Sequence, residues 1–259
     1  MAEAISVLGV TLAAVGLVHN SALARWEQGE IWTAAENVTM LAVPQLWLWI
    51  TGRRFADYGL GAANLKPQWD AVCACAIPFA AFALPSLLDW NGFSWLAILF
   101  MFGAPVAALY LFAFRLRKKA PAAMVLAPCL LLAFAPHAMS RAAAGLTFYV
   151  FLLGPSEEVL FRGVIQSRLN LAFGRPFTFH GAKWGWGTAI ASALFGLLHA
   201  VNPYALFAGQ WHPIWLAAPI TFCGALPFAF LRERTGGVLA PGLLHAWPQG
   251  IAFAIKAVR

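Results

Sequence analysis

The chain has 259 residues, of which 61% are hydrophobic and only 10% are charged, and its formal net charge is +7. An ordinary soluble domain carries about 25% charged residues, so this composition excludes a typical soluble protein and predicts a polytopic membrane protein. The basic residues cluster in loops beside apolar runs, as in cytoplasmic loops of membrane proteins, which argues against nucleic acid as a partner.

Apolar runs of about 20 residues, the length that a helix needs to cross a bilayer, alternate along the chain with charged or Gly/Pro breaks. Because these runs are continuous rather than alternating, they disfavour a membrane β-barrel. They predict an all-α integral membrane bundle of eight or nine spans. The predicted spans are 4–24, 31–51, 69–88, 94–114, 122–140, 143–168, 187–201, 214–231 and 237–255. In the second span, Glu36 is expected to form an interhelical hydrogen bond.

Lysine and arginine residues indicate the orientation of the bundle. With nine spans and an inside N-terminus, most of them fall in loops on one side, which the positive-inside rule assigns to the cytoplasm. These loops are 52–68, 115–121, 169–186 and 232–236. The third loop also contains several aromatic residues and is predicted to lie at the membrane interface. We therefore expect a multi-pass integral membrane protein, in the cell inner membrane if the source is bacterial.

The sequence contains no internal repeat or linker, so we predict one integral membrane domain over 1–259. Within it, 1–140 would form variable N-terminal spans and 141–259 a core that carries the motifs described next.

Glu157 and Glu158 stand side by side within a long apolar run, with Arg162 following them. A charge at the centre of a bilayer costs roughly 2.5–3.5 kcal/mol, so two adjacent acids there indicate a buried polar site. Residues four apart share a helix face, so Glu158 is expected to pair with Arg162, which leaves Glu157 to act as a base. Gly154-Pro155 should kink the helix just before this pair. A purely structural ion pair is the alternative interpretation.

Two later spans carry further polar residues, His199 after Phe195 and Gln249 after His245. Each pair is four residues apart and is expected on one helix face. Counted at 1.5 Å per residue from the predicted inner ends, Glu157, His199 and His245 lie about 12–18 Å deep. This similar depth predicts one shared polar cavity within the membrane. Taken singly, each histidine could instead be an interhelical hydrogen-bonding residue.

The patterns E-E-x-x-x-R, F-x-x-x-H and H-x-x-x-N, in this order on successive spans, resemble the CPBP family. This family comprises CAAX prenyl endopeptidases and bacteriocin-processing relatives, also called the ABI group. The patterns fall here at 157–162, 195–199 and 245–249. The stretches 235–239 and 57–60 also resemble the family. The likeness covers roughly 145–255.

The resemblance implies an all-helical intramembrane endopeptidase that hydrolyses a peptide bond of a membrane-associated protein or peptide. Carried over by position, its site residues are Glu157, Glu158, Arg162, His199, His245 and Gln249. Glu157 and His199 would activate water, His245 and Gln249 would stabilise the oxyanion, and the other two would hold the site in place. Gln249 departs from the usual Asn, which puts its role in question, and Asn202 is a less favoured substitute.

Several alternatives stay open. No cofactor is favoured, but zinc is possible, because the same Glu and His residues could bind it with an open position for water. A second interpretation is a non-enzymatic membrane immunity or scaffold protein in which the polar cluster is structural. A transporter would need paired broken helices in two related halves, which the sequence lacks. The expected partners are the lipid bilayer and a membrane-anchored protein or peptide substrate.

Overall fold

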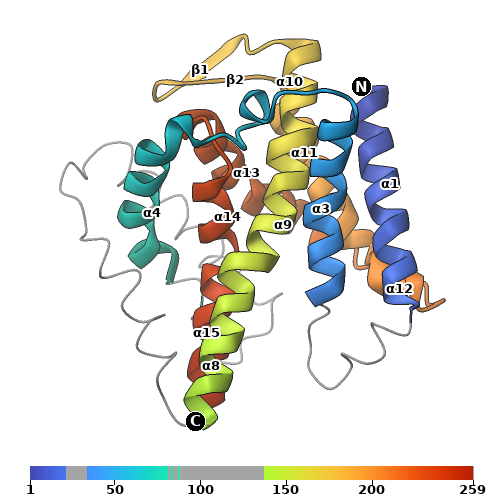
Figure 1. The fold of residues 1–259 in the computed structure, drawn as a ribbon, viewed down its shortest axis with the longest axis vertical. Helices are drawn as coiled ribbons and strands as arrows, with labels where there is room; N and C mark the ends of the chain where they lie inside the picture. The colour runs from blue at the N-terminus through green and yellow to red at the C-terminus, as the bar shows by residue number, and fades with distance from the viewer. Residues whose placement is uncertain (22–33, 81–82, 84–86, 88–136, 259) are drawn as a thin grey trace. The chain divides into compact units, whose positions relative to one another are not determined.

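The computed structural model describes residues 1–21, 34–80, 83, 87 and 137–258, and most of these residues are helical (Figure 1). The predicted span 94–114 and most of the span 122–140 lie outside the described residues. The chain divides into two compact units, Met1–Ala63 with Ser156–Val238 and Asn64–Pro155 with Leu239–Arg259. Within the described part, two helices, Ala2–His19 and Arg141–Phe173, are long and apolar enough to cross a membrane. The count of eight or nine spans stays a prediction.

The first unit packs its helices around an apolar core that includes Val7, Leu48 and Ile165. Its elements are α1 (Ala2–His19), α3 (Ala34–Ile50), 3₁₀ turns at Phe55–Tyr58 and Ala62–Asn64, α10 (Ser167–Phe173), α11 (Trp186–Val201), α12 (Pro203–Phe207) and α13 (Ala217–Thr235). The helices α1 and α3 lie side by side (Figure 1). The helices α11 and α13 approach so closely that a Cβ on Gly196 would lie 2.4 Å from the carbonyl oxygen of Ala218. Only glycine fits at such a contact.

One run of helical residues covers 137–173, which is longer than the predicted span 143–168. It contains α8 (His137–Phe148), a π-helical segment at Tyr149–Leu153, α9 (Gly154–Glu158), a second π-helical segment at Val159–Gln166, and α10. Helical residues continue through Gly154-Pro155, where a kink was predicted. The N–H of Gly154 donates to the carbonyl of Tyr149, five residues back. This wider turn accommodates Pro155, which has no N–H of its own to donate.

The strands β1 (Phe177–Phe179) and β2 (Ala182–Trp184) form an antiparallel hairpin in the loop that was predicted to lie at the interface. The all-α prediction did not include it. His180 and Gly181 connect the strands with φ angles of 45° and 76°, as a two-residue type I′ turn requires. Strands of three residues are too short to show an alternating pattern in the sequence.

The second unit contains α4 (Leu65–Ala80), α8, α14 (Leu239–His245) and α15 (Trp247–Val258). The helices α8 and α15 pack together. The side-chain oxygen of Gln68 accepts hydrogen bonds from the N–H groups of Leu239 (2.6 Å) and Ala240 (3.4 Å). It thereby satisfies donors that the first turn of a helix leaves without an intrahelical partner. The indole N–H of Trp247 donates to the carbonyl of Ala76 (2.9 Å) and joins α15 to α4.

The predicted span 237–255 is two helices rather than one, because α14 ends at His245 and α15 begins at Trp247. Pro248 provides the physical reason, since it has no N–H to donate to the carbonyl four residues back and its ring clashes with that carbonyl. His245 and Gln249 therefore lie on different helices, and the prediction that they share one helix face is wrong.

Candidate active site

Glu158 and Arg162 form the ion pair that their spacing predicts. Arg162 Nε lies 3.2 Å from Glu158 Oε2, and both side chains are fully buried. Arg162 Nη2 donates to the carbonyl of Ala225 in α13 (3.2 Å), and the guanidinium lies 4.7 Å from the centroid of the Phe195 ring in α11. The predicted pairing is confirmed, and Arg162 connects its own helix to two others.

The residue before the two glutamates is also anchored. Ser156 Oγ donates to Asn37 Oδ1 (3.0 Å), and both residues are buried. The neighbouring residue of α3, Glu36, lies 2.7 Å from Nδ1 of His19 in α1 through its Oε1. Glu36 is buried and His19 is half-buried, so this is a partly buried contact between two helices. The expected interhelical hydrogen bond of Glu36 is confirmed.

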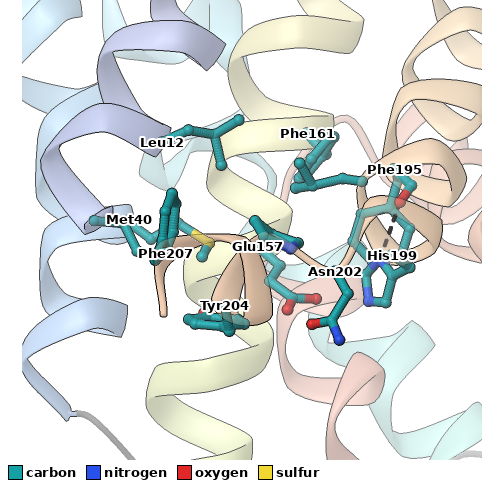
Figure 2. A pocket seen from close by; sticks show the side chains of 12 residues that line it. Leu12, Met40, Glu157, Phe161, Phe195, His199, Asn202, Tyr204 and Phe207 are labelled. Atoms are coloured by element: carbon teal, nitrogen blue, oxygen red, sulfur yellow. Dashed lines mark hydrogen bonds between the residues drawn. The ribbon is translucent and has the colours of Figure 1, made fainter. Parts of the chain in front are cut away.

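Glu157 lines a cavity of about 110 Å³ formed by α1, α3, α9, α11 and α12 (Figure 2). His199 of α11 lines the same cavity, together with apolar residues such as Leu12 and Phe207. A cavity of this size has room for several water molecules. Glu157 is half-buried and His199 is exposed. The structure thus brings together two of the predicted site residues from distant parts of the chain.

The hydrogen bond of His199 fixes its tautomer. Nδ1 lies 2.9 Å from the carbonyl oxygen of Phe195, and the two rings pack with their centroids 4.4 Å apart. Because a carbonyl oxygen only accepts, Nδ1 must carry the proton. In the neutral imidazole, Nε2 then has a lone pair that can accept a hydrogen bond from water or a proton.

Two further polar residues, Asn202 and Tyr204, line the cavity beside Glu157 (Figure 2). Sequence reasoning ranked Asn202 low and overlooked Tyr204. Burial raises the pKa of the Tyr204 phenol, and the carboxylates of Glu157 and Glu36 raise that pKa further, so the hydroxyl stays protonated. The Asn202-Pro203 step, which is typical of a helix end, was the available sequence signal.

His245 and Gln249 belong to the second unit, where His245 is half-buried and Gln249 is exposed. The helix that carries His245 has close contacts within this unit. The helix α14 packs against Tyr149–Leu153, and a Cβ on Gly154 would lie only 2.3 Å from the carbonyl oxygen of Gly242. The chain that carries His245 is therefore packed against the segment that leads to Glu157. The catalytic roles of His245 and Gln249 stay predictions.

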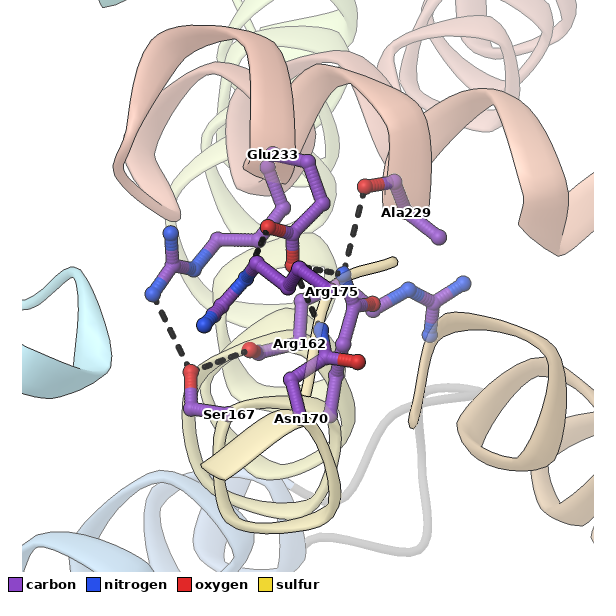
Figure 3. Close-up of polar contacts among 8 residues, drawn as sticks. Arg162, Ser167, Asn170, Arg175, Ala229 and Glu233 are labelled. Carbon is purple, nitrogen blue, oxygen red and sulfur yellow. Dashed lines mark hydrogen bonds and ion pairs between the residues drawn. The ribbon is translucent and has the colours of Figure 1, made fainter. Parts of the chain in front are cut away.

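A second polar network surrounds Glu233, near the end of α13 (Figure 3). Its carboxylate accepts hydrogen bonds from Gln166 (2.7 Å), Asn170 (2.9 Å) and Arg175 (2.8 Å). Together with Arg162, the first two form a row at four-residue steps, and their partners on α13 are spaced in the same way. This row fixes the register of the motif helix against α13.

The stretches 57–60 and 235–239, both of which resemble the CPBP family, meet in the first unit. The N–H of Val238 donates to the carbonyl of Gly59 (3.1 Å). Gly59 has a φ of 74°, and a Cβ there would lie 2.8 Å from the guanidinium of Arg232. Both the backbone conformation and the close approach of Arg232 therefore require glycine.

The zinc alternative can be examined through its donors. Among the residues that the structure describes, no three His, Cys, Asp or Glu side chains are grouped so that they could hold a metal ion. Glu158, one of the donors considered for zinc, is paired with Arg162. Metal dependence itself stays a matter for prediction.

Comparison with known proteins bears on the motif-bearing part of the chain. Residues 139–249 match the family model described as Type II CAAX prenyl endopeptidase Rce1-like. Neither the curated proteins nor the solved structures contain a match. The matched segment includes all six predicted site residues. Proteins of the matched family are membrane proteases. Residues 139–249 of this chain are therefore similar to the Rce1-like, type II CAAX prenyl endopeptidase group of the CPBP family.

Proposed function

We propose that this protein is a multi-pass intramembrane endopeptidase that hydrolyses a peptide bond of a membrane-associated protein or peptide, with Glu157 as the general base. One observation carries the proposal. Glu157 and His199 line the same cavity, whereas the adjacent Glu158 is held by Arg162. The two neighbouring carboxylates thus lie in different surroundings, which suits a catalytic role for Glu157 and a structural role for Glu158.

In the first step, a water molecule in the cavity donates one hydrogen to the Glu157 carboxylate and the other to Nε2 of His199. A lone pair of the water oxygen then points at the carbonyl carbon of the substrate. As the new C–O bond forms, the first proton moves to Glu157. General base catalysis of this kind contributes typically about 10²–10⁴-fold to the rate.

In the second step, N–H donors stabilise the oxyanion of the tetrahedral intermediate, a role that we assign to His245 and Gln249. Loss of one such donor typically lowers kcat by about 10²–10³-fold. Protonated Glu157 then gives its proton to the amide nitrogen as the C–N bond breaks. The products are a carboxylic acid and an amine, and Glu157 is ionised again.

Glu158 and Arg162 act as positioning residues in this mechanism, and no metal is needed. A metal ligated by Glu158 would lie beside the guanidinium, which is 3.2 Å from the carboxylate, and would be repelled by it. Elemental analysis and treatment with a strong chelator test this point. Stoichiometric zinc whose removal abolishes activity would contradict it.

The function is tested by comparing the C-termini of membrane proteins in cells that carry the wild-type protein or Glu157→Gln. Glutamine keeps the size of the side chain and removes the base. We expect C-termini that appear with the wild type and are missing with the variant. Glu36→Gln is the matched control, because Glu36 is a buried carboxylate of the same unit that does not line the cavity.

If Glu157→Gln produces the same C-termini as the wild type, the proposal is wrong. The non-enzymatic interpretation would then account for the cluster. It expects variants of Glu158 or Arg162 to lose thermal stability and no cleavage product to form in any strain.

A further inference from the structure

The oxyanion site is the least determined part of the mechanism, because His245 and Gln249 lie on two different helices and Gln249 is exposed. The oxyanion must form within reach of Glu157, since the water that Glu157 activates attacks the carbonyl carbon. An N–H donor on the wall of the Glu157 cavity is therefore a strong candidate for this role.

Asn202 is such a donor. Its side chain lines the same cavity as Glu157 and His199, and all three are labelled in Figure 2. The amide forms no hydrogen bond with any residue in the described part of the chain, so both of its N–H groups are available to a substrate. The side-chain amide of Asn is also short, which limits how far it can move.

The backbone holds Asn202 in a demanding conformation. Its φ and ψ are 52° and 70°, in the left-handed region, and Pro203 follows it. Its N–H donates to the carbonyl of Leu198 (3.1 Å), and its own carbonyl accepts from Leu206 (3.2 Å). In the described residues, the one other non-glycine residue with positive φ is His180, in the hairpin turn. Strained residues of this kind cluster at active sites.

We propose that Asn202 is a catalytic residue whose Nδ2–H donates to the carbonyl oxygen of the scissile peptide bond, and this inference rests on the function proposed above. The hydrogen bond strengthens as the oxygen becomes negative during attack by water. Since the interaction is stronger in the transition state than in the ground state, its loss lowers kcat more than it changes KM.

The test uses two substitutions of the full-length protein. Asn202→Gly removes the amide and adopts the left-handed conformation without strain. Asn202→Asp keeps the shape of the side chain and its tolerance of that conformation, but its carboxylate has no N–H. His180→Gly is the control for relief of positive φ away from the cavity, and Glu157→Gln is the inactive reference. The probe is a synthetic peptide that spans a bond whose cleavage in cells depends on Glu157.

We expect both Asn202 variants to lower kcat by about 10²–10³-fold with KM nearly unchanged. His180→Gly should retain wild-type activity, and the Tm of Asn202→Gly should equal or exceed that of the wild type. Wild-type kcat in either Asn202 variant, while Glu157→Gln is inactive, would overturn this inference and leave the proposed function intact. A loss of activity in Asn202→Gly that is accompanied by a lower Tm and a raised KM would also overturn it. Glu157-independent cleavage would instead refute the proposed function.

Discussion

The buried ion pair between Glu158 and Arg162 allows a sharp test of how the first unit is held together. Arg162→Met removes the guanidinium, keeps a long apolar side chain and leaves the Glu158 carboxylate buried without its cation. Because both side chains are fully buried in the wild type, we expect this variant to lose about 3–5 kcal/mol of unfolding free energy.

The magnitude follows from the contacts of Arg162. At 3.2 Å and an effective dielectric constant of about 20, the attraction between the two charges is about 5 kcal/mol. The hydrogen bond to the Ala225 carbonyl adds about 1.5–3 kcal/mol, and the contact with the Phe195 ring adds about 2 kcal/mol. Burial of the two charges costs several kcal/mol for each, so the net value of the pair is small. Removing one partner is therefore much worse than removing both.

The double variant Glu158→Gln/Arg162→Met separates these terms. It should recover to within about 2 kcal/mol of the wild type, since neither charge is left alone. Unfolding in detergent micelles, followed by the fluorescence of the 12 tryptophans, gives the free energies of the four proteins in the cycle. If Arg162→Met does not fold, folding of the double variant still reports the coupling. A double variant that loses the sum of the two single losses would refute the reasoning.

Three other contacts give matched predictions. Gly154→Ala should lower the free energy of unfolding by about 1–3 kcal/mol, because the new Cβ would lie 2.3 Å from the carbonyl oxygen of Gly242. The control is Gly224→Ala, whose Cβ would meet nothing within 4 Å and which should be neutral or stabilising. Thermal unfolding of both variants checks this prediction. Glu233→Ala should cost about 2–4 kcal/mol because it removes the acceptor of three hydrogen bonds, and an unchanged Tm would show that these bonds contribute nothing. Glu36→Ala should cost about 1.5–3 kcal/mol while Glu157-dependent cleavage continues, and loss of cleavage at unchanged stability would contradict its structural role.

The sequence predicted those features that depend on spacing within one helix. The Glu158–Arg162 pair was correct because four residues bring side chains onto one face whatever the tertiary structure does. The interhelical hydrogen bond of Glu36 was predicted correctly because a carboxylate in an apolar helix needs a partner on another helix. The order of the three patterns also predicted the family whose model matches residues 139–249.

Predictions failed where the backbone departs from regular helix. His245 and Gln249 were assigned to one helix face, but Pro248 divides their span into two helices. The hairpin that turns at His180 was missed because its strands are too short to show periodicity. In each case the deciding information was local backbone geometry that composition and periodicity do not encode.

The position of Arg162 connects stability with chemistry. The two adjacent carboxylates, of which Glu158 is buried and Glu157 half-buried, repel each other. Arg162 neutralises the charge of Glu158 and so weakens this repulsion, which suits the proposed role of Glu157 as the base. The double variant Glu158→Gln/Arg162→Met lacks the arginine, but it also lacks the Glu158 charge that repels Glu157. It should therefore retain more of the Glu157-dependent cleavage than Arg162→Met alone, measured at equal amounts of folded protein. If both variants are equally inactive, the arginine has a role in the reaction beyond neutralising its neighbour.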